Sequence, residues 1–332
     1  MGMTIRDIAE MCDVSTATVS RVLNSPDQVA EKTREKVLQV IKEENYIPNQ
    51  IAKNLNSNIT NNIALFIFDI MNPFFTKLIK EANRIAFDRN YSLIICDTEN
   101  EKERELKYLN YINKSKFAGL ILTEGISGEV LEKLDPSYPV VCIDRYINSN
   151  SNRNYPIITS ENKEGARKAV EYLVTLNHKK IAHVSGTPGV KTADERKQGY
   201  LDIVEKYELP VDERYIYTGD FRTESGIKAL EYFLSLEEMP TAIFCANDLM
   251  AKGLLGRSMS LNINVPGDLS IIGFDGILNN SYYKLTTVKQ SITQMAAVAM
   301  NELINLIEKK TVSPKERKIP GKLIVGDTCQ KL

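Results

Sequence analysis

The spacing of apolar positions changes near residue 60, and the chain falls into two parts with different periods. In the first part, apolar side chains recur at helical spacing in three short runs, which begin at Thr4, at Ser15 and at Glu31 or Thr33. Thr4 and Ser15 can cap helices, and Asp7 completes a capping-box-like pair with Thr4. Three short helices, two of them joined by a tight turn, predict a helix-turn-helix. The positions expected to face inward are Ile5, Ile8, Ala9, Met11, Cys12, Val19, Val22, Leu23, Val37, Val40 and Ile41.

The second part alternates continuous runs of β-branched and apolar residues with segments of helical period. Such runs are typical of parallel strands that are buried on both faces. Eight strand-helix units predict an α/β core of two similar doubly wound parallel-sheet domains, preceded by a small all-α domain. The strand-like runs are 62–69, 91–98, 119–124, 139–145, 180–186, 215–220, 241–248 and 269–276. Helical segments lie between them, for instance at 74–89, 102–114, 161–177, 223–235 and 291–309.

The second predicted helix, in the run VSTATVSRVLN (14–24), turns small and polar side chains outward. Its helical spacing leaves Thr16, Ala17, Ser20 and Arg21 on the exposed face. Hydroxyls and a small side chain allow a helix to approach the DNA major groove closely, and arginine can pair with guanine or phosphate. The alternative is an ordinary three-helix bundle with a Ser/Thr-rich surface. Residues 1–60 have seven basic and eight acidic side chains, so DNA binding would depend on how charge is distributed.

Composition narrows the class of protein. The chain has 332 residues, 43% of them hydrophobic, which is enough for two or more domains with real cores. The net charge of -1 gives no global signal for nucleic acid or membrane. Five scattered cysteines without CxxC spacing favour reduced thiols over disulfides or a zinc site. We find no apolar leader and no stretch of about 18 apolar residues. We therefore expect a cytoplasmic protein that contacts no membrane and holds no metal or other cofactor.

Polar residues follow the strand-like runs at their carboxyl ends. In open α/β sheets, ligands bind in the crevice beyond those ends. Two facing domains would line a cleft with carboxylates, amides and hydroxyls, which suits a polyol. The alternative is that these side chains only cap the helices that follow. The positions are Asp69, Asp97, Thr123, Asp144, Ser185, Asp220, Asn247, Asp248 and Asp275.

Catalytic motifs are missing from the sequence. The two histidines, His178 and His183, have the positions of structural or exposed residues. We find no GxSxG, HExxH or Walker motif and no GxGxxG after a strand. An enzyme is therefore disfavoured, although carboxylate-only chemistry stays open at this point.

The first 55 residues resemble the DNA-binding headpiece of the lac repressor family of bacterial transcription regulators. The segments that carry the resemblance are TIRDIAEMCDVSTATVSRVLN (4–24) and KTREKVLQVIKEENYIPNQIAKNL (32–55). It implies that Thr16, Ala17 and Arg21 contact base edges. Asp13 stands where the family usually has glycine, and aspartate tolerates the left-handed conformation of such a turn. The further implied DNA contacts, mostly to the backbone, are Thr4, Ser15, Ser20, Asn24, Thr33 and Tyr46.

The segment PNQIAKNL (48–55) resembles the hinge helix of the same family. Barely two turns of helix are unstable alone in water, so the alternative is a flexible linker. The resemblance implies a helix that folds on DNA and inserts Leu55 into the minor groove, where an apolar wedge kinks the duplex. Asn49 and Ala52 are its other implied DNA contacts.

Residues 62–328 resemble the sugar-binding-protein-like core of this family. The motifs are DIMNPFF (69–75), VVCIDR (140–145), RKQGY (196–200), GDFRTESG (219–226), AIFCANDLMAKG (242–253), VPGDLSIIGFDG (265–276) and LTTVKQ (285–290). Two departures are Gly276, where a second acidic or amide residue is frequent, and Lys284, where proline is usual. Arg196 and Asp275 are the central implied effector contacts, unless they pair with each other as a structural bridge. The remaining candidates are Asp69, Phe74, Asp144, Arg145, Phe221, Asn247 and Gln290.

Together these features predict a cytoplasmic, homodimeric transcription regulator that binds palindromic operator DNA and answers to a small effector, a sugar or sugar phosphate. The predicted domains are a headpiece (1–47), a hinge (48–61), one core subdomain (62–160 with 291–320) and a second (161–290 with 321–332). One alternative is a sugar-binding protein of the transport type. The other is a regulator that a partner protein controls.

Overall fold

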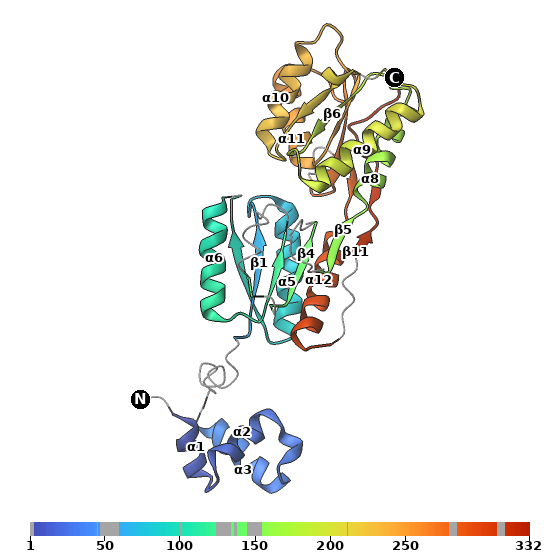
Figure 1. Ribbon diagram of the computed structural model, residues 1–332. Helices are drawn as coiled ribbons and strands as arrows, with labels where there is room; N and C mark the ends of the chain where they lie inside the picture. Colours follow the sequence, from blue (N-terminus) through green and yellow to red (C-terminus); the bar gives the residue numbers. More distant parts are fainter. Residues whose placement is uncertain are drawn as a thin grey trace. The chain divides into compact units, whose positions relative to one another are not determined.

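The computed structural model describes residues 3–44, 46, 60–99, 101–123, 134–135, 138–144, 155–210, 212–278, 284–310 and 316–332. The chain divides into two units, Met1–Thr60 and Asn61–Leu332. Figure 1 shows the course of the chain through both. The predicted hinge contacts Asn49, Ala52 and Leu55 lie outside the described residues, and so does Arg145.

The first unit has the three predicted helices, α1 (Ile5–Met11), α2 (Thr16–Asn24) and α3 (Glu31–Glu43). Thr4 and Asp7 form the expected capping box, and the Ser15 hydroxyl accepts from Thr18 N at the start of α2. Asp13 has φ +52°, so it takes the left-handed turn position that the sequence predicts. The core of this unit consists of Ile8, Ala9, Cys12, Val19, Val22, Val37 and Tyr46.

Two features of the first unit differ from the sequence prediction. Met11, expected to face inward, is 49% exposed, because it lies on the last turn of α1 beyond the three-helix core. A short 3-10 helix, η1 (Pro26–Gln28), also precedes α3, with Pro26 as its first residue. Proline fits a first helical position because it has no N–H to leave unpaired there.

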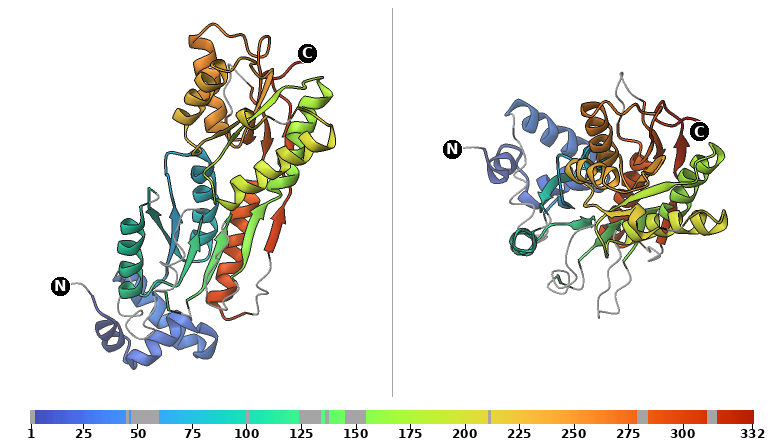
Figure 2. Two further views of the ribbon diagram at one scale, coloured as in Figure 1. Left: turned by 45° about the horizontal axis from the view of Figure 1, so that its top comes forward. Right: turned by 90° about the horizontal axis from the view of Figure 1, so that it is seen from above.

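The first sheet of the second unit has the strand order β11-β5-β4-β3-β1-β2 and is parallel throughout. Its strands are β1 (Asn62–Ile67), β2 (Ser92–Asp97), β3 (Gly119–Leu122), β4 (Val140–Ile143), β5 (Ile157–Ser160) and β11 (Glu316–Ile319). Helices α5 (Pro73–Asp88) and α12 (Ile292–Ile307) pack on one face, and α6 (Lys102–Ser115) packs on the other. Figure 2 shows helices on both faces of this sheet, as the continuous apolar runs predict.

The second sheet has the order β12-β10-β9-β8-β6-β7. Its strands are β6 (Ile181–Ser185), β7 (Ile216–Thr218), β8 (Ala242–Cys245), β9 (Ser270–Asp275), β10 (Thr286–Lys289) and β12 (Lys322–Ile324). A 3-10 helix, η2 (Glu213–Tyr215), leads into β7. Helices α10 (Thr223–Leu234) and α11 (Asp248–Ser260) cover one face, and α8 (Asn162–Thr175) and α9 (Lys191–Lys206) cover the other. Two parallel α/β sheets confirm the predicted fold class, with one exception: β12 runs antiparallel to β10.

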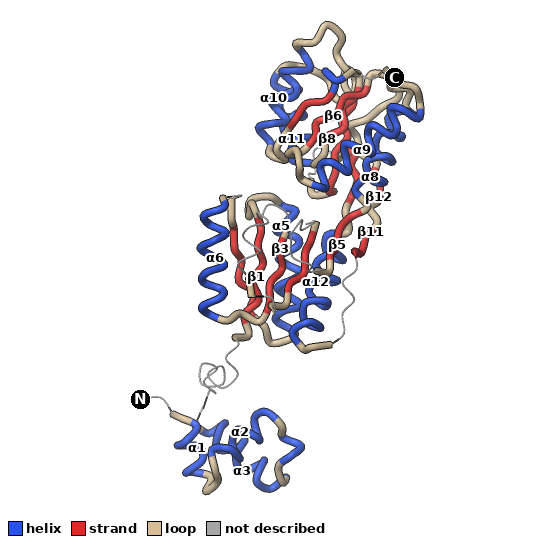
Figure 3. The backbone as a smooth tube through the Cα atoms, viewed as in Figure 1, coloured by secondary structure: helices blue, strands red, loops and turns tan. Residues whose placement is uncertain are grey.

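The chain passes three times between the two sheets, after β5, after β10 and after β11 (Figure 3). Strands β5, β10, β11 and β12 were not among the eight predicted, because they are short and contribute few apolar residues. We use first lobe and second lobe below for the parts of the chain that contribute to the first and second sheet. The predicted subdomain boundaries stay a prediction.

Candidate functional site

Helix α2 presents the small, polar face that the sequence predicts. Val19 and Val22 point into the core of the first unit, whereas Thr16, Ala17 and Arg21 are exposed. Thr16 and Ser20, like Ala17 and Arg21, are four residues apart and therefore neighbours on the helix surface. Ser20 is only half-buried. The exposed side chains of α2 are thus small or polar, apart from the long side chain of Arg21.

The other predicted DNA contacts of the first unit have mixed positions. The Thr4 and Ser15 hydroxyls are engaged in helix caps, and Thr33 is half-buried on the first turn of α3. Tyr46 is only 9% exposed and belongs to the core, so its ring supports the three helices as well. The side chain of Asn24 lies outside the described residues.

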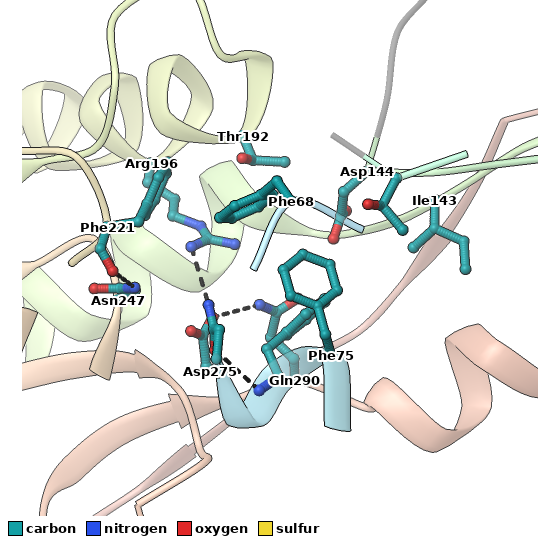
Figure 4. A pocket seen from close by; sticks show the side chains of 13 residues that line it. Phe68, Phe75, Ile143, Asp144, Thr192, Arg196, Phe221, Asn247, Asp275 and Gln290 are labelled. Carbon is teal, nitrogen blue, oxygen red and sulfur yellow. Dashed lines mark hydrogen bonds and ion pairs between the residues drawn. The ribbon is translucent and has the colours of Figure 1, made fainter. Parts of the chain in front are cut away.

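The second unit contains a cavity of about 450 Å³, counting its open mouth, with walls from both lobes (Figure 4). The residues of these walls come from the two sheets and from the helices and loops around each sheet. Only the folded unit brings them together. The lining residues are Phe68, Asn72, Phe74, Phe75, Thr123, Ile143 and Asp144 of the first lobe, and Thr192, Arg196, Phe221, Asn247, Asp275 and Gln290 of the second.

Arg196 projects from α9 into this cavity and is held on several sides. Its Nε donates to Asn162 Oδ1 at 2.9 Å, and its Nη1 donates to the Ala246 carbonyl at 2.7 Å. The guanidinium also lies over the Phe274 ring, 4.0 Å from the centroid. A guanidinium fixed in this way presents its remaining donors in one direction at little entropic cost.

Asp275 stands at the end of β9 and faces Arg196, as Figure 4 shows. Gln290 Nε2 donates to its Oδ1 at 2.7 Å, and Arg196 Nη1 lies 3.7 Å from the same oxygen. The pair therefore has an ionic contact, but it is too long for a direct hydrogen bond. Burial raises the pKa of Asp275 to about 7, against the lowering effect of Arg196. The bridge and ligand interpretations of the sequence are thus compatible: the two charges are neighbours, and both line the cavity.

A closed ring of polar contacts links the two lobes beneath the cavity. Thr159 Oγ1 donates to Asp144 Oδ1 at 2.7 Å, and Asn162 Nδ2 donates to Thr159 at 3.3 Å. The Ser160 hydroxyl donates to Gln290 Oε1, and Ser160 N donates to Asp144 Oδ1 at 3.3 Å. The remaining links run from Gln290 to Asp275, from Asp275 to Arg196, and from Arg196 to Asn162. Burial raises the pKa of Asp144, while the Thr159 hydroxyl opposes that shift.

Phenylalanines form the apolar walls of the cavity. The ring of Phe75 meets those of Phe68 and Phe74 edge to face, with centroids 4.8 and 5.2 Å apart. On the second lobe, the ring of Phe221 contacts Gly186 so closely that an added Cβ there would meet the ring. Such faces pack well against the C–H surface of a ring-shaped ligand.

Asn247 and Asp248 serve the protein as well as the cavity. Asn247 Oδ1 accepts from Met250 N as the cap of α11, and its Nδ2 donates to the Phe221 carbonyl at 2.8 Å. The buried Asp248 accepts from Ile277 N at 2.7 Å and from the Thr287 hydroxyl at 2.6 Å. Asn247 therefore both lines the cavity and positions the Phe221 wall. Burial raises the pKa of Asp248 to about 6.

Seven of the nine predicted effector contacts line the cavity, namely Phe74, Asp144, Arg196, Phe221, Asn247, Asp275 and Gln290. Asp69 does not, because its Oδ1 closes a local turn with Met71 N at 2.9 Å. Asp97, Ser185 and Asp220 also bond to backbone groups, but none of them caps the helix that follows it, as the capping alternative would require. The residues that site prediction missed are Phe68, Asn72, Phe75, Thr123, Ile143 and Thr192. Thr123 was visible as a strand-end residue, and Asn72 and Phe75 lie within the DIMNPFF motif.

Both histidines have structural positions. His183 is buried, stacks between Tyr200 and Phe244, and has its pKa lowered to about 3 by burial. His178 bonds to the Thr241 hydroxyl and the Gln330 carbonyl, and burial lowers its pKa. The described residues contain no cluster of side chains suited to a metal ion. Within the same part of the chain, no helix is long and apolar enough to cross a membrane.

Both units of the chain match families of known proteins. Residues 4–49 match the family described as bacterial regulatory proteins, lacI family, and residues 170–329 match a periplasmic binding protein-like domain. The chain is 38% identical over 330 residues to the ribose operon repressor of Halalkalibacterium halodurans, covering 98% of this chain and 97% of the relative.

Two solved structures extend the comparison. One is the lac repressor dimer bound to operator and an anti-inducer, with a TM-score of 0.84 at 24% identity, covering 99% of this chain and 100% of that one. The other is a regulator from Alkaliphilus metalliredigens in complex with D-xylulofuranose, with a TM-score of 0.71 at 25% identity. It covers 81% of this chain and 99% of that one. The first likeness concerns the fold alone.

Proposed function

Because the chain belongs to the LacI family of bacterial regulatory proteins, we propose that a small carbohydrate in the cavity controls how tightly the first unit holds operator DNA. The protein is a DNA-binding transcription regulator and not an enzyme. The observation that carries the proposal is the pairing of Arg196 with Asp275 on a cavity walled by phenylalanines. A guanidinium and a carboxylate hold the acceptor and donor hydroxyls of a sugar, while aromatic faces cover its C–H surface.

On the DNA side, α2 enters the major groove in this proposal. Thr16, Ala17 and Arg21 contact base edges because they are the exposed side chains of that helix. The residues that position the headpiece on the DNA backbone are Thr4, Ser15, Ser20, Asn24, Thr33 and Tyr46. The hinge adds Asn49, Ala52 and the wedge Leu55, as the resemblance to the family implies.

The regulator works in the cytoplasm, where its operator lies, and it binds as a homodimer. Two-fold symmetry of the protein then requires two inverted half-sites in the DNA. An effector that binds one arrangement of the two lobes more tightly than another shifts the dimer between states of different operator affinity. The cavity supports this coupling because its walls come from both lobes. The lobes comprise 62–160 with 291–320 and 161–290 with 321–332.

The two alternatives make different predictions. A transport-type binding protein would bind the sugar but no operator, which the DNA-binding headpiece disfavours. A regulator that mainly answers to a partner protein would bind operator, yet no small molecule in the cavity would change that affinity.

The test joins a ligand screen to a DNA assay. Purified protein is screened by thermal shift against pentoses, hexoses, disaccharides, sugar phosphates and purines, since a ligand that binds the folded state raises the melting temperature. Each hit is then added to an operator-binding titration. We expect a carbohydrate that both raises the melting temperature and changes operator affinity by about tenfold or more, the range of typical coupling energies. A purine that did both, or carbohydrates that did neither, would refute the carbohydrate assignment.

A further inference from the structure

The charges around the cavity are unbalanced. Its lining has two carboxylates, Asp144 and Asp275, and a single cationic group, Arg196, among the residues that the structure describes. A third buried carboxylate, Asp248, directly follows Asn247 of the lining. Along these described walls, an anion that entered would therefore face more carboxyl groups than cations, in a partly desolvated space where repulsion is poorly screened.

The cation of the described lining is already engaged by the protein. Arg196 donates through Nε to Asn162 and through Nη1 to the Ala246 carbonyl, and its positive charge faces Asp275. Lys77 comes near from α5, but its ammonium donates to the Gly276 carbonyl at 3.0 Å and does not line the cavity. A phosphate group would have to compete with Asp275 for the same guanidinium.

Helix starts at the cavity offer an anion little. The start of α5 is capped by Asn72, which accepts from Phe74 N at 3.0 Å. The start of α11 is capped by Asn247 and has Asp248 as its first residue. The start of α9 has no side-chain cap, but it holds Asp194 in its first turn. The partial positive charge of these helix ends is thus already met by the protein's own polar and acidic side chains.

The carboxylates keep acceptor atoms for a ligand. Asp144 and Asp275 both use Oδ1 for their internal contacts. In the described part of the chain no residue donates to Oδ2 of either one. Sugar hydroxyls can donate to such oxygens, whereas a phosphate dianion can only accept.

We propose that the cavity takes an uncharged carbohydrate and rejects its phosphate ester, and that Asp144 and Asp275 make this discrimination. The inference rests on the proposed function, since it concerns the ligand of the same cavity. Hydroxyl donors of the sugar bind the two Oδ2 atoms, and the phenylalanines cover its C–H face. Charge repulsion, rather than size, excludes the ester.

Proton linkage provides a signature of this arrangement. Burial raises the pKa of Asp275 in the free protein, so part of it is protonated near neutral pH. Hydroxyls that donate to its carboxylate favour the ionised form and lower that pKa, so binding of a neutral sugar releases protons. Binding of an anion would favour the protonated form and take protons up.

The experiment uses the full chain and matched pairs: D-ribose with D-ribose 5-phosphate, D-xylose with D-xylose 5-phosphate, and D-glucose with D-glucose 6-phosphate. Calorimetric titrations at pH 7 in two buffers of different ionisation enthalpy give both affinity and proton exchange. We expect at least one free sugar to bind at least about tenfold more tightly than its ester, the scale of one charge-assisted contact, with release of protons.

Substitutions assign the discrimination to residues. Asp144→Asn and Asp275→Asn keep the size of each side chain and remove its charge. Each substitution should weaken binding of the free sugar. It should also lower the ratio of the ester's Kd to the sugar's Kd by about tenfold. The matched control is Asp97→Asn, a carboxylate at the end of β2 outside the cavity lining, which should leave both unchanged.

The outcomes separate this inference from the proposed function. The inference is overturned if an ester binds as tightly as its free sugar, or if an ester binds while its free sugar does not. Either result leaves the carbohydrate effector intact. If neither member of any pair binds and the wider thermal-shift screen yields no carbohydrate, the carbohydrate effector itself is refuted and the inference with it. A carbohydrate that only the screen finds is compared with its own phosphate ester in the same way. Should an asparagine variant fail to fold, the comparison of sugar and ester on the unmodified protein still decides.

Discussion

Three residues that line the cavity have left-handed or otherwise positive φ angles: Asp144 at +54°, Phe221 at +67° and Asp275 at +119°. Non-glycine residues rarely adopt such angles, and the strain persists only where surrounding contacts hold it. Here those contacts are the Thr159, Asn247 and Gln290 bonds. Asparagine is the natural replacement for either aspartate because it tolerates positive φ and keeps the side-chain size.

At the same scale, Arg21 is the clearest test of DNA reading. Its side chain is exposed on α2 and makes no hydrogen bond or ion pair with the residues that the structure describes. Arg21→Ala should weaken specific operator binding by about 1–3 kcal/mol if the guanidinium pairs with guanine. Exchange of Thr16 and Ala17 should instead alter which operator is preferred. Quantitative footprinting on a set of operator variants measures both effects.

The control for Arg21 is Arg6→Ala on α1, which removes an arginine from a helix that does not present the predicted reading face. Non-specific binding should drop slightly in both variants, since each loses one positive charge. Unchanged operator affinity and unchanged sequence preference in the Arg21 and Thr16/Ala17 variants would show that α2 is not the reading helix.

Asp275 also predicts a pH dependence. Its folded pKa, about 7, is above the ordinary value of about 4, so the folded state binds its proton more tightly than the unfolded chain does. Its favourable contribution to the free energy of unfolding is complete below about pH 4 and is lost as the pH rises through about 7. Asp275→Asn should therefore melt above the parent protein at pH 7.5 and lose that advantage near pH 4.5. Thermal melts without ligand across this range provide the measurement, and an advantage that does not vary with pH would contradict it.

Among the elements, a side-chain hydrogen bond connects two of the segments that cross between the lobes. Ser160, at the end of β5, donates to Gln290, which follows β10, and both are buried. Ser160→Ala would leave the buried side-chain oxygen of Gln290, Oε1, without its hydrogen-bond donor. The free energy of unfolding should fall by about 1–3 kcal/mol, the usual cost of an orphaned buried polar group. Urea denaturation followed by circular dichroism measures this loss.

A matched substitution lies on the neighbouring crossover. Ser291 donates to the Pro320 carbonyl at 3.2 Å in a solvent-exposed bond. Because water can replace that donor, Ser291→Ala should change stability by no more than about 0.5 kcal/mol. Equal losses in the two variants would mean that burial does not strengthen the Ser160 link between the lobes.

At the scale of the whole molecule, the proposed dimer makes a prediction about DNA geometry. Two headpieces linked through one dimer bind inverted half-sites together, and the second contact benefits from a high effective concentration. An operator with one half-site scrambled should therefore bind at least about a hundredfold more weakly than the intact palindrome. Gel shifts on intact, half-scrambled and direct-repeat operators give the comparison, with mass photometry of the complex to count protein chains. Equal affinity for the half-scrambled operator would argue for a monomer.

The sequence was most informative where structure depends on near neighbours. The capping box of Thr4 and Asp7, the cap at Ser15 and the left-handed turn at Asp13 need only a few residues of chain, and all three are present. The long buried strands were visible for a similar reason, because both of their faces are covered and most of their positions are apolar. Met11 was misplaced because helical spacing indicates a face but not how far the core extends along it.

The short strands β5, β10, β11 and β12 could not be recognised in the same way. Each has only three or four residues, and three of the four residues of β11 are charged, which the sheet edge tolerates. Their place is set by pairing with strands distant in the sequence, such as β11 with β5. No local pattern records such a pairing.

For the candidate site, the sequence by itself determined which polar residues end strands, and through the family resemblance which of them to favour. Only the tertiary structure decided that Asp144 and Asp275 face one cavity, while Asp69 closes a local turn and Asp97 accepts from Ile70 N outside the cavity lining. It also decided that Phe68 and Phe75, which were not among the predicted site residues, supply cavity walls. The physical reason is that a side chain's local hydrogen bonds depend on a few neighbouring residues. Its meeting with Arg196 depends on how two separate sheets pack and where the chain crosses between them.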